Sequence, residues 1–147
     1  RLFHGAPWDK CKAICATNFN VDLAGKGATW KADASATRGM PLYGYGIYFA
    51  ENVTKSDEYA GVIFDSGCGK DLHSLLLCRV IGGKSNFVTT NEYDKDKLWS
   101  DVFNGPYHSV FGDRVVELKK PYREFVVYDK DQVFPEFLLM YERLMDP

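Results

Sequence analysis

The sequence of 147 residues has no apolar run that approaches the roughly 18 residues needed to span a bilayer, and we expect no membrane-spanning segment. It also has little net charge, −2 in formal terms, so no basic field indicates nucleic acid as the main partner, although one small site could still hold it. The sequence opens at Arg1-Leu2-Phe3 without a methionine or a signal-peptide pattern, and we expect further residues upstream. We expect an intracellular domain, in the cytoplasm or the nucleus, where cysteines stay reduced.

Cysteine is sparse, with four residues, and their spacing demands neither disulfide bonds nor a metal site. Cys11 and Cys15 lie four residues apart on an expected helix and would share one face as small apolar side chains. Cys78 lies in an apolar run, where we expect a buried thiol. Cys68 and His73 come closest to the paired ligands of a zinc site but are too few, so we predict no metal and reduced thiols.

Hydrophobic residues make up 46% and aromatic residues 15% of the chain, enough for one packed core, and we predict a single domain over residues 1–147. Helical spacing predicts a helix over 8–17, which Asn18 would end in the left-handed conformation. Further elements are expected as strands over 1–4, the end of 43–50, 74–81, 86–90, 122–128 and 133–141, and as short helices over 52–60 and 93–103. Pro135 suits a strand end or an edge strand. Many short strands with few helices indicate an α+β fold dominated by sheet.

Residues 20–42 form a long segment rich in Gly, Ala, Thr, Lys and Asp, without periodicity. A loop of that length is either functional, commonly an active-site lid, or a surface insertion.

Two pairs of residues suggest a site for a flat ligand. His4 and Gly5 end the first strand, where glycine allows a ligand to approach the backbone and histidine offers a hydrogen-bonding group beside it, although a lone histidine is more often a surface residue. Tyr48 and Tyr59 could face one another across a slot for a planar ring, or could be two core residues.

Glu124 is the third feature. In its strand, period two places this carboxylate on the same face as Val126 and Tyr128. A buried and unpaired carboxylate costs several kcal/mol, so Glu124 either lies at the edge of the sheet or lines a cleft.

Five segments in one order carry a resemblance to a known family. They are LFHG at 2–5, YGYGIYFAENVTKSDEY at 43–59, LLCRVIGGKS at 76–85, YHSVFG at 107–112 and YREFVVYDKDQVFPEFLLMY at 122–141. Together they resemble the catalytic domain of the poly(ADP-ribose) polymerases, and the tankyrases in particular. The resemblance spans nearly the whole chain and implies the ADP-ribosyltransferase fold, with split, mostly antiparallel β-sheets and short flanking helices.

The resemblance also implies a His-Tyr-Glu triad at His4, Tyr48 and Glu124. His4 would bind a ribose hydroxyl of NAD+. Glu124 would hold the nicotinamide ribose and, in polymer-forming members, polarise the acceptor hydroxyl.

The family's remaining contacts with NAD+ fall on residues close to the triad. Gly5 and Ser56 would bind the nicotinamide carboxamide, Tyr59 and Tyr48 would enclose its ring, and Lys55 would lie near the acceptor.

The implied activity is that of a transferase, which splits NAD+ and passes ADP-ribose to a protein or to a growing poly(ADP-ribose) chain without a metal. Transfer of a single unit, hydrolysis of NAD+ and an inactive interaction module are the alternatives. Two departures from the family stand out: Ala6 replaces the usual Ser or Thr after His-Gly, and residues 20–42, in place of the loop over NAD+, have an unfamiliar sequence. The acceptor and the oligomeric state are not determined by the sequence.

Overall fold

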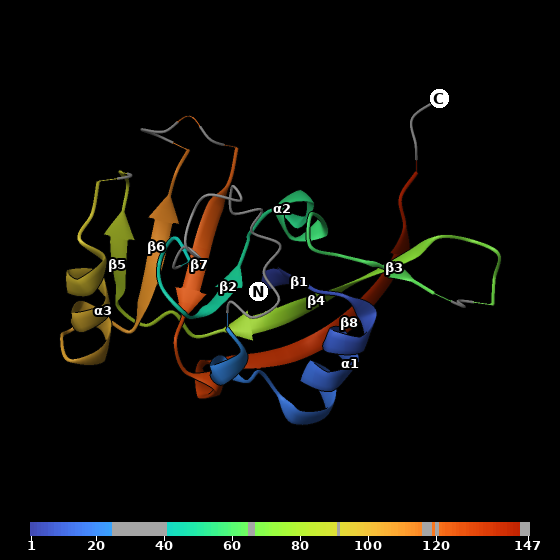
Figure 1. Ribbon diagram of the computed structural model, residues 1–147, viewed down its shortest axis with the longest axis horizontal. Helices are drawn as coiled ribbons and strands as arrows, with labels where there is room; N and C mark the ends of the chain where they lie inside the picture. Colours follow the sequence, from blue (N-terminus) through green and yellow to red (C-terminus); the bar gives the residue numbers. More distant parts are fainter. Residues whose placement is uncertain (25–40, 65–66, 91, 116–118, 120, 145–147) are drawn as a thin grey trace, which may run out of the picture.

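The computed structural model describes residues 1–24, 41–64, 67–90, 92–115, 119 and 121–144. Within them the chain forms two four-stranded sheets, which stand side by side in Figure 1. The first sheet contains β1 (Leu2–Gly5), β3 (Val62–Ile63), β4 (Leu72–Val80) and β8 (Val133–Glu142). The second has the order β2 (Ile47–Phe49), β7 (Arg123–Val127), β6 (Ser109–Asp113) and β5 (Ser85–Val88).

β4 is the centre of the first sheet because both of its edges are paired. β8 runs antiparallel to its whole length, while β1 and β3 pair with successive parts of the other edge. The long apolar run of β4 fits this position, since Leu75, Leu76 and Cys78 are all buried. Pro135 lies on β8, which pairs with β4 alone in the described part of the chain, beside a register shift at Leu77 and Cys78. The expectation of an edge strand is therefore confirmed.

The second sheet is antiparallel except for the pair β5 and β6, which is parallel. The two sheets meet where β1 touches the end of β2. Phe3 and Ala50 form an isolated antiparallel bridge there, with N–H to carbonyl distances of 2.8 and 3.0 Å. This junction brings the first strand beside the segment that contains Tyr48.

In the described ranges, three short helices and two 3₁₀ turns flank the sheets (Figure 1): α1 (Trp8–Thr17), α2 (Val53–Asp57), α3 (Lys95–Phe103), η1 (Val21–Leu23) and η2 (Lys130–Gln132). α1 has the predicted bounds, and Asn18 ends it with a positive φ of 66°, as expected, but its ψ of 179° is extended and differs from the expected left-handed helical conformation. The Asp94 carboxylate caps α3 by accepting from the N–H groups of Asp96 and Lys97 at 2.9 and 3.0 Å. α1 packs on β4 and β8, so the first sheet is covered on one face.

The predicted α+β class with two mostly antiparallel sheets is confirmed, and the differences are local. α2 ends at Asp57 instead of Ala60, because the amides of Tyr59 and Ala60 bond three residues back, as in a tight turn. β3 and β6 were not expected: β3 has only two residues, and Gly112 interrupts the strand pattern of β6. Cys15 is exposed, although Cys11 on the same helix is buried, so their expected shared apolar face is wrong for Cys15.

Across the described residues, no helix is long and apolar enough to cross a membrane. In the same part of the chain, no three His, Cys, Asp or Glu side chains gather as a metal site would require.

Candidate functional site

The register of the second sheet places Tyr48 and Glu124 on one face. Tyr48 is the direct partner of Val126, and directly paired residues point to the same side of a sheet. Glu124 shares that side because it lies two residues from Val126 on β7. The prediction that Glu124 and Val126 share a face is thus met in the fold, and Glu124 is only 8% exposed.

The carboxylate of Glu124 is buried with cations on two flanks. Burial raises its pKa, while the charges of Lys55 on α2 and Arg114 after β6 lower it, and Glu58 raises it further. An Arg114 nitrogen lies 3.9 Å from a carboxylate oxygen. The site can therefore hold a negative charge in partly dry surroundings, where that charge acts more strongly than in water.

The hydroxyl of Tyr48 holds the backbone of the segment before β2. It accepts from the Tyr43 amide at 2.9 Å and donates to the Gly44 carbonyl at 2.8 Å. Tyr128 donates to the Tyr43 carbonyl, and Tyr93 donates to the Leu42 carbonyl. Three phenols thus fix residues 42–44. The sequence does not predict this feature, because no local pattern reports which backbone group a tyrosine hydroxyl will reach.

His4 joins the site through the backbone of Tyr48. Its Nδ1 lies 2.9 Å from the Tyr48 carbonyl oxygen, and because a carbonyl only accepts, Nδ1 must carry the proton. The ring packs edge-on against Phe19 at 4.9 Å and near Phe49 at 5.6 Å. Burial lowers the pKa of His4, which the bond to Tyr48 offsets in part, so the neutral ring keeps Nε2 as an acceptor for a hydroxyl.

Gly5 is packed against α2 with no room for a side chain. A Cβ atom at Gly5 would overlap the backbone carbonyl of Ser56 and come within 3.1 Å of the Tyr59 Cβ. Ser56 is 4% exposed. Lys55 lies over the Tyr59 ring at 5.2 Å and donates to Glu58 at 2.7 Å. These contacts bring the predicted carboxamide-binding residues together at the junction of β1 and α2.

Six of the seven predicted site residues therefore lie on β1, β2, β7 and α2, and Tyr59 lies in the turn that follows α2. These elements meet at the junction of the two sheets. The rings of Tyr48 and Tyr59, which were expected to face one another, are not in contact. The Tyr48 ring stacks on the Tyr43 ring, with 6.5 Å between the ring centroids. Most of the predicted loop over the ligand, residues 25–40, lies outside the described residues.

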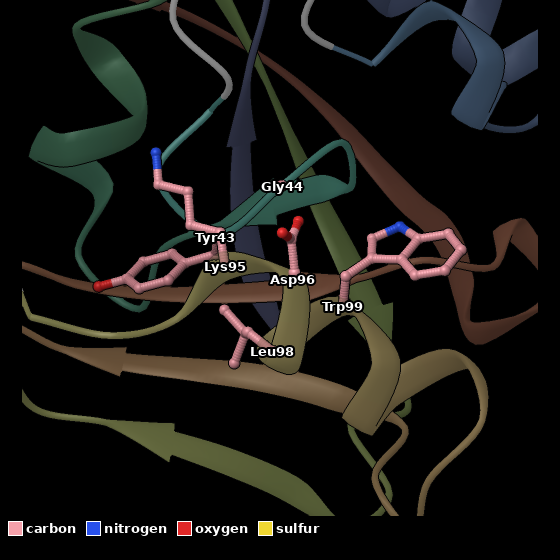
Figure 2. Close-up of a pocket in the computed structure, with 6 residues that line it drawn as sticks. All are labelled: Tyr43, Gly44, Lys95, Asp96, Leu98 and Trp99. Carbon is pink, nitrogen blue, oxygen red and sulfur yellow. The ribbon is translucent and has the colours of Figure 1, made fainter.

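A cavity of about 320 Å³ lies beside the segment that the phenols hold, lined by Tyr43, Gly44, Lys95, Asp96, Leu98 and Trp99. Figure 2 shows Tyr43 and Trp99 on its two sides, with Asp96 between them. It touches neither Tyr48 nor Tyr59, so it is not the predicted slot between those two rings. It opens next to the backbone that positions the Tyr48 hydroxyl.

Comparison with known proteins shows the family to which the chain belongs. The model of the poly(ADP-ribose) polymerase catalytic domain matches residues 1–143. The human protein mono-ADP-ribosyltransferase PARP12 is 27% identical over 151 aligned positions, covering all of this chain and 18% of PARP12. The mouse protein of the same name is 28% identical over 147 positions, covering all of this chain and 17% of that protein. The chain thus spans less than a fifth of the length of these relatives. Because the family model matches nearly the full length of the chain, the chain belongs to the poly(ADP-ribose) polymerase catalytic domain family, whose domains use NAD+ as a substrate.

Proposed function

We propose that this domain transfers a single ADP-ribose unit from NAD+ to a protein acceptor and releases nicotinamide. The family supports ADP-ribosyl transfer, and the names of the human and mouse relatives support transfer of one unit. The two relatives therefore favour the alternative of the sequence analysis over a tankyrase-like, polymer-forming enzyme. Synthesis of a polymer, which the intact triad glutamate suggests by resemblance, becomes the alternative outcome of the test below.

The proposal depends on one observation: the carboxylate of Glu124 is buried on the same face of the sheet as Tyr48. When nicotinamide leaves, positive charge spreads over C1 and the ring oxygen of the ribose, as in glycoside cleavage. A fixed carboxylate beside that sugar stabilises the charge more in the transition state than in the ground state, and this difference accelerates the reaction. Glu124 would also accept a hydrogen bond from a hydroxyl of the same ribose.

His4 and Gly5 would orient the dinucleotide. In the neutral ring with its proton on Nδ1, Nε2 would accept from a ribose hydroxyl of NAD+. The backbone of Gly5 and the hydroxyl of Ser56 would bind the carboxamide, and the rings of Tyr48 and Tyr59 would enclose the nicotinamide. Fixing both ends of the ligand would hold the scissile bond in a reactive geometry.

The bond between ribose C1 and the nicotinamide nitrogen would break with its electron pair on nitrogen, which leaves neutral nicotinamide. A lone pair of the acceptor would form the new bond to C1, and any acceptor proton would pass to Glu124 or to water. Lys55, close enough to lower the pKa of Glu124, would lie beside the incoming acceptor.

The proposal is tested by nicotinamide release from NAD+ in wild type and in Glu124→Gln. We expect the variant to lose on the order of 10²–10³-fold in kcat, because the amide removes the charge and keeps the shape. Glu142→Gln is the matched control. Glu142 is exposed at the end of β8, in the other sheet, and pairs with Lys70, so this variant should retain full activity. Equal rates in wild type and Glu124→Gln would overturn the assigned site.

The product formed with adenylate-labelled NAD+ distinguishes the kinds of transfer. A single discrete shift of a protein band supports transfer of one unit, whereas a ladder indicates polymer. Free ADP-ribose without labelled protein indicates hydrolysis. Absence of turnover in the folded wild-type domain would favour the inactive interaction module.

A further inference from the structure

Arg114 directly follows β6, and the sheet places it beside Glu124. Gly112 is the direct partner of Glu124 in the β6–β7 ladder, and Arg114 lies two residues beyond Gly112, on the same side by period two. Such diagonal neighbours are about 7–8 Å apart, within reach of a long side chain. The 3.9 Å between Arg114 Nη1 and the Glu124 carboxylate is an ion-pair distance but is too long for a hydrogen bond.

The guanidinium of Arg114 is turned inward. The side chain is 28% exposed, and its Nε is buried without a hydrogen-bond partner among the residues described. Buried N–H donors seldom lack a hydrogen-bond partner, so the position of Arg114 beside a buried carboxylate calls for a functional explanation. Arg123, the neighbour of Glu124 in sequence, is committed elsewhere, to Asp113 at 3.2 Å and Glu51 at 3.1 Å.

The other groups that face Glu124 do not replace this charge. Lys55 approaches from α2, on the opposite flank of β7, and is hydrogen-bonded to Glu58, whose own charge opposes it. The phenols of Tyr43, Tyr48 and Tyr93 also face Glu124, and burial raises the pKa of each one above its ordinary value. These phenols therefore stay neutral over the range in which a carboxylate titrates.

We propose that Arg114 is a positioning residue for Glu124, which holds the carboxylate from the β6 side and keeps it negatively charged for the reaction. The catalytic part of the inference rests on the proposed function. Burial raises the pKa of Glu124, and Lys55 and Arg114 work against that rise. Without Arg114, Lys55 is the cation among the described residues that still lowers the pKa of Glu124. Glu124 should therefore become protonated at a higher pH in such a variant than in wild type.

The test compares three substitutions at position 114 with wild type. Arg114→Gln and Arg114→Met remove the charge, and methionine keeps much of the unbranched apolar stem, so that packing is retained. Arg114→Lys keeps the charge. Arg79→Gln is the matched control, because Arg79 is exposed and pairs with Glu136 on the other sheet. Each protein is checked by circular dichroism and thermal unfolding, and kcat/KM for nicotinamide release is measured from pH 4 to pH 9.

The active form needs ionised Glu124, so activity falls as the pH drops through the pKa of this residue. We expect the acid limb of the profile to move upward by about one pH unit in Arg114→Gln and Arg114→Met, and to stay in place in Arg114→Lys and in the control. An unmoved acid limb in folded Arg114→Gln and Arg114→Met would overturn the proposal, whether or not the maximal rate falls.

A second measurement separates this inference from the proposed function. The Glu124 carboxyl is titrated by NMR in protein with ¹³C-labelled glutamate, and its signal is identified by its loss in Glu124→Gln. A higher apparent pKa in Arg114→Gln than in wild type supports the inference even if wild type releases no nicotinamide. Equal values in the two proteins refute it, even if the enzyme is active.

Discussion

Gly5→Ala should destabilise the domain strongly, because the added methyl group has no free space. The Cβ would overlap the carbonyl of Ser56, a backbone group of α2 that cannot rotate away, and would lie 3.1 Å from the Tyr59 Cβ. Relief requires β1 and α2 to separate, and β1 is paired with β4 over Leu2–Gly5.

The expected loss is about 3 kcal/mol in the free energy of unfolding, the upper part of the range for overpacking, because the obstacle is backbone instead of a flexible side chain. Replacement of glycine by alanine also stiffens the unfolded chain, which offsets about 0.4–1 kcal/mol. Gly61→Ala is the matched control for that second effect. A Cβ at Gly61 meets Pro7 at an ordinary 3.7 Å, so this variant should be neutral or slightly more stable.

Urea unfolding followed by tryptophan fluorescence and circular dichroism measures both variants. A difference of about 2–4 kcal/mol between Gly5→Ala and Gly61→Ala is expected, which corresponds to roughly 5–15 °C in melting temperature for a domain of this size. A Gly5→Ala variant within about 0.5 kcal/mol of the control would refute the close approach of β1 to α2 on which the carboxamide site depends.

Three further predictions address other parts of the molecule. Tyr48→Phe should lower the free energy of unfolding by about 1–3 kcal/mol in urea, because two backbone groups of the preceding segment lose their partner, and an unchanged value would contradict those bonds. Glu136, whose pKa is lowered to about 2 by Arg1 and Arg79, stabilises the fold above its unfolded pKa of about 4.3 and loses this contribution as the pH falls through about 2. Glu136→Gln should therefore narrow the stability difference between pH 6 and pH 2, which acid unfolding measures, and the same slope in both proteins would count against the pair. Brief treatment of the native protein with iodoacetamide should modify the exposed thiols, Cys15 and Cys68, and spare the two buried ones until denaturant is added, as peptide mass spectrometry would reveal.

Local patterns were sufficient for much of the fold. Helical spacing with a terminating asparagine predicted α1 at its observed bounds, because both signals act within one or two turns. The apolar run of β4 and the proline of β8 predicted a buried strand and an edge strand, since burial and the missing N–H are properties of the residues themselves. Alternation along β7 likewise predicted that Glu124 and Val126 share one face.

The order of the five motifs also sufficed for the family, which the match over residues 1–143 confirms. It did not suffice for the kind of transfer, because the same triad residues are expected for polymer synthesis, for transfer of a single unit and for hydrolysis of NAD+. The relatives with mono-ADP-ribosyltransferase names shift the proposal to a single unit.

The sequence by itself determined most of the helices and strands, although not β3 and β6, and it determined the face that Glu124 shares with Val126 and the family to which the chain belongs. Only the tertiary structure decided how those faces meet. It paired β6 in parallel with β5 and in antiparallel with β7, and so put Arg114 beside Glu124. It also fixed the proton of His4 on Nδ1 by setting that nitrogen against the carbonyl of Tyr48, 44 residues away. The physical reason is range: spacing along the chain reports local geometry, whereas register, hydroxyl partners and buried charge pairs depend on contacts between distant segments that exist only after folding.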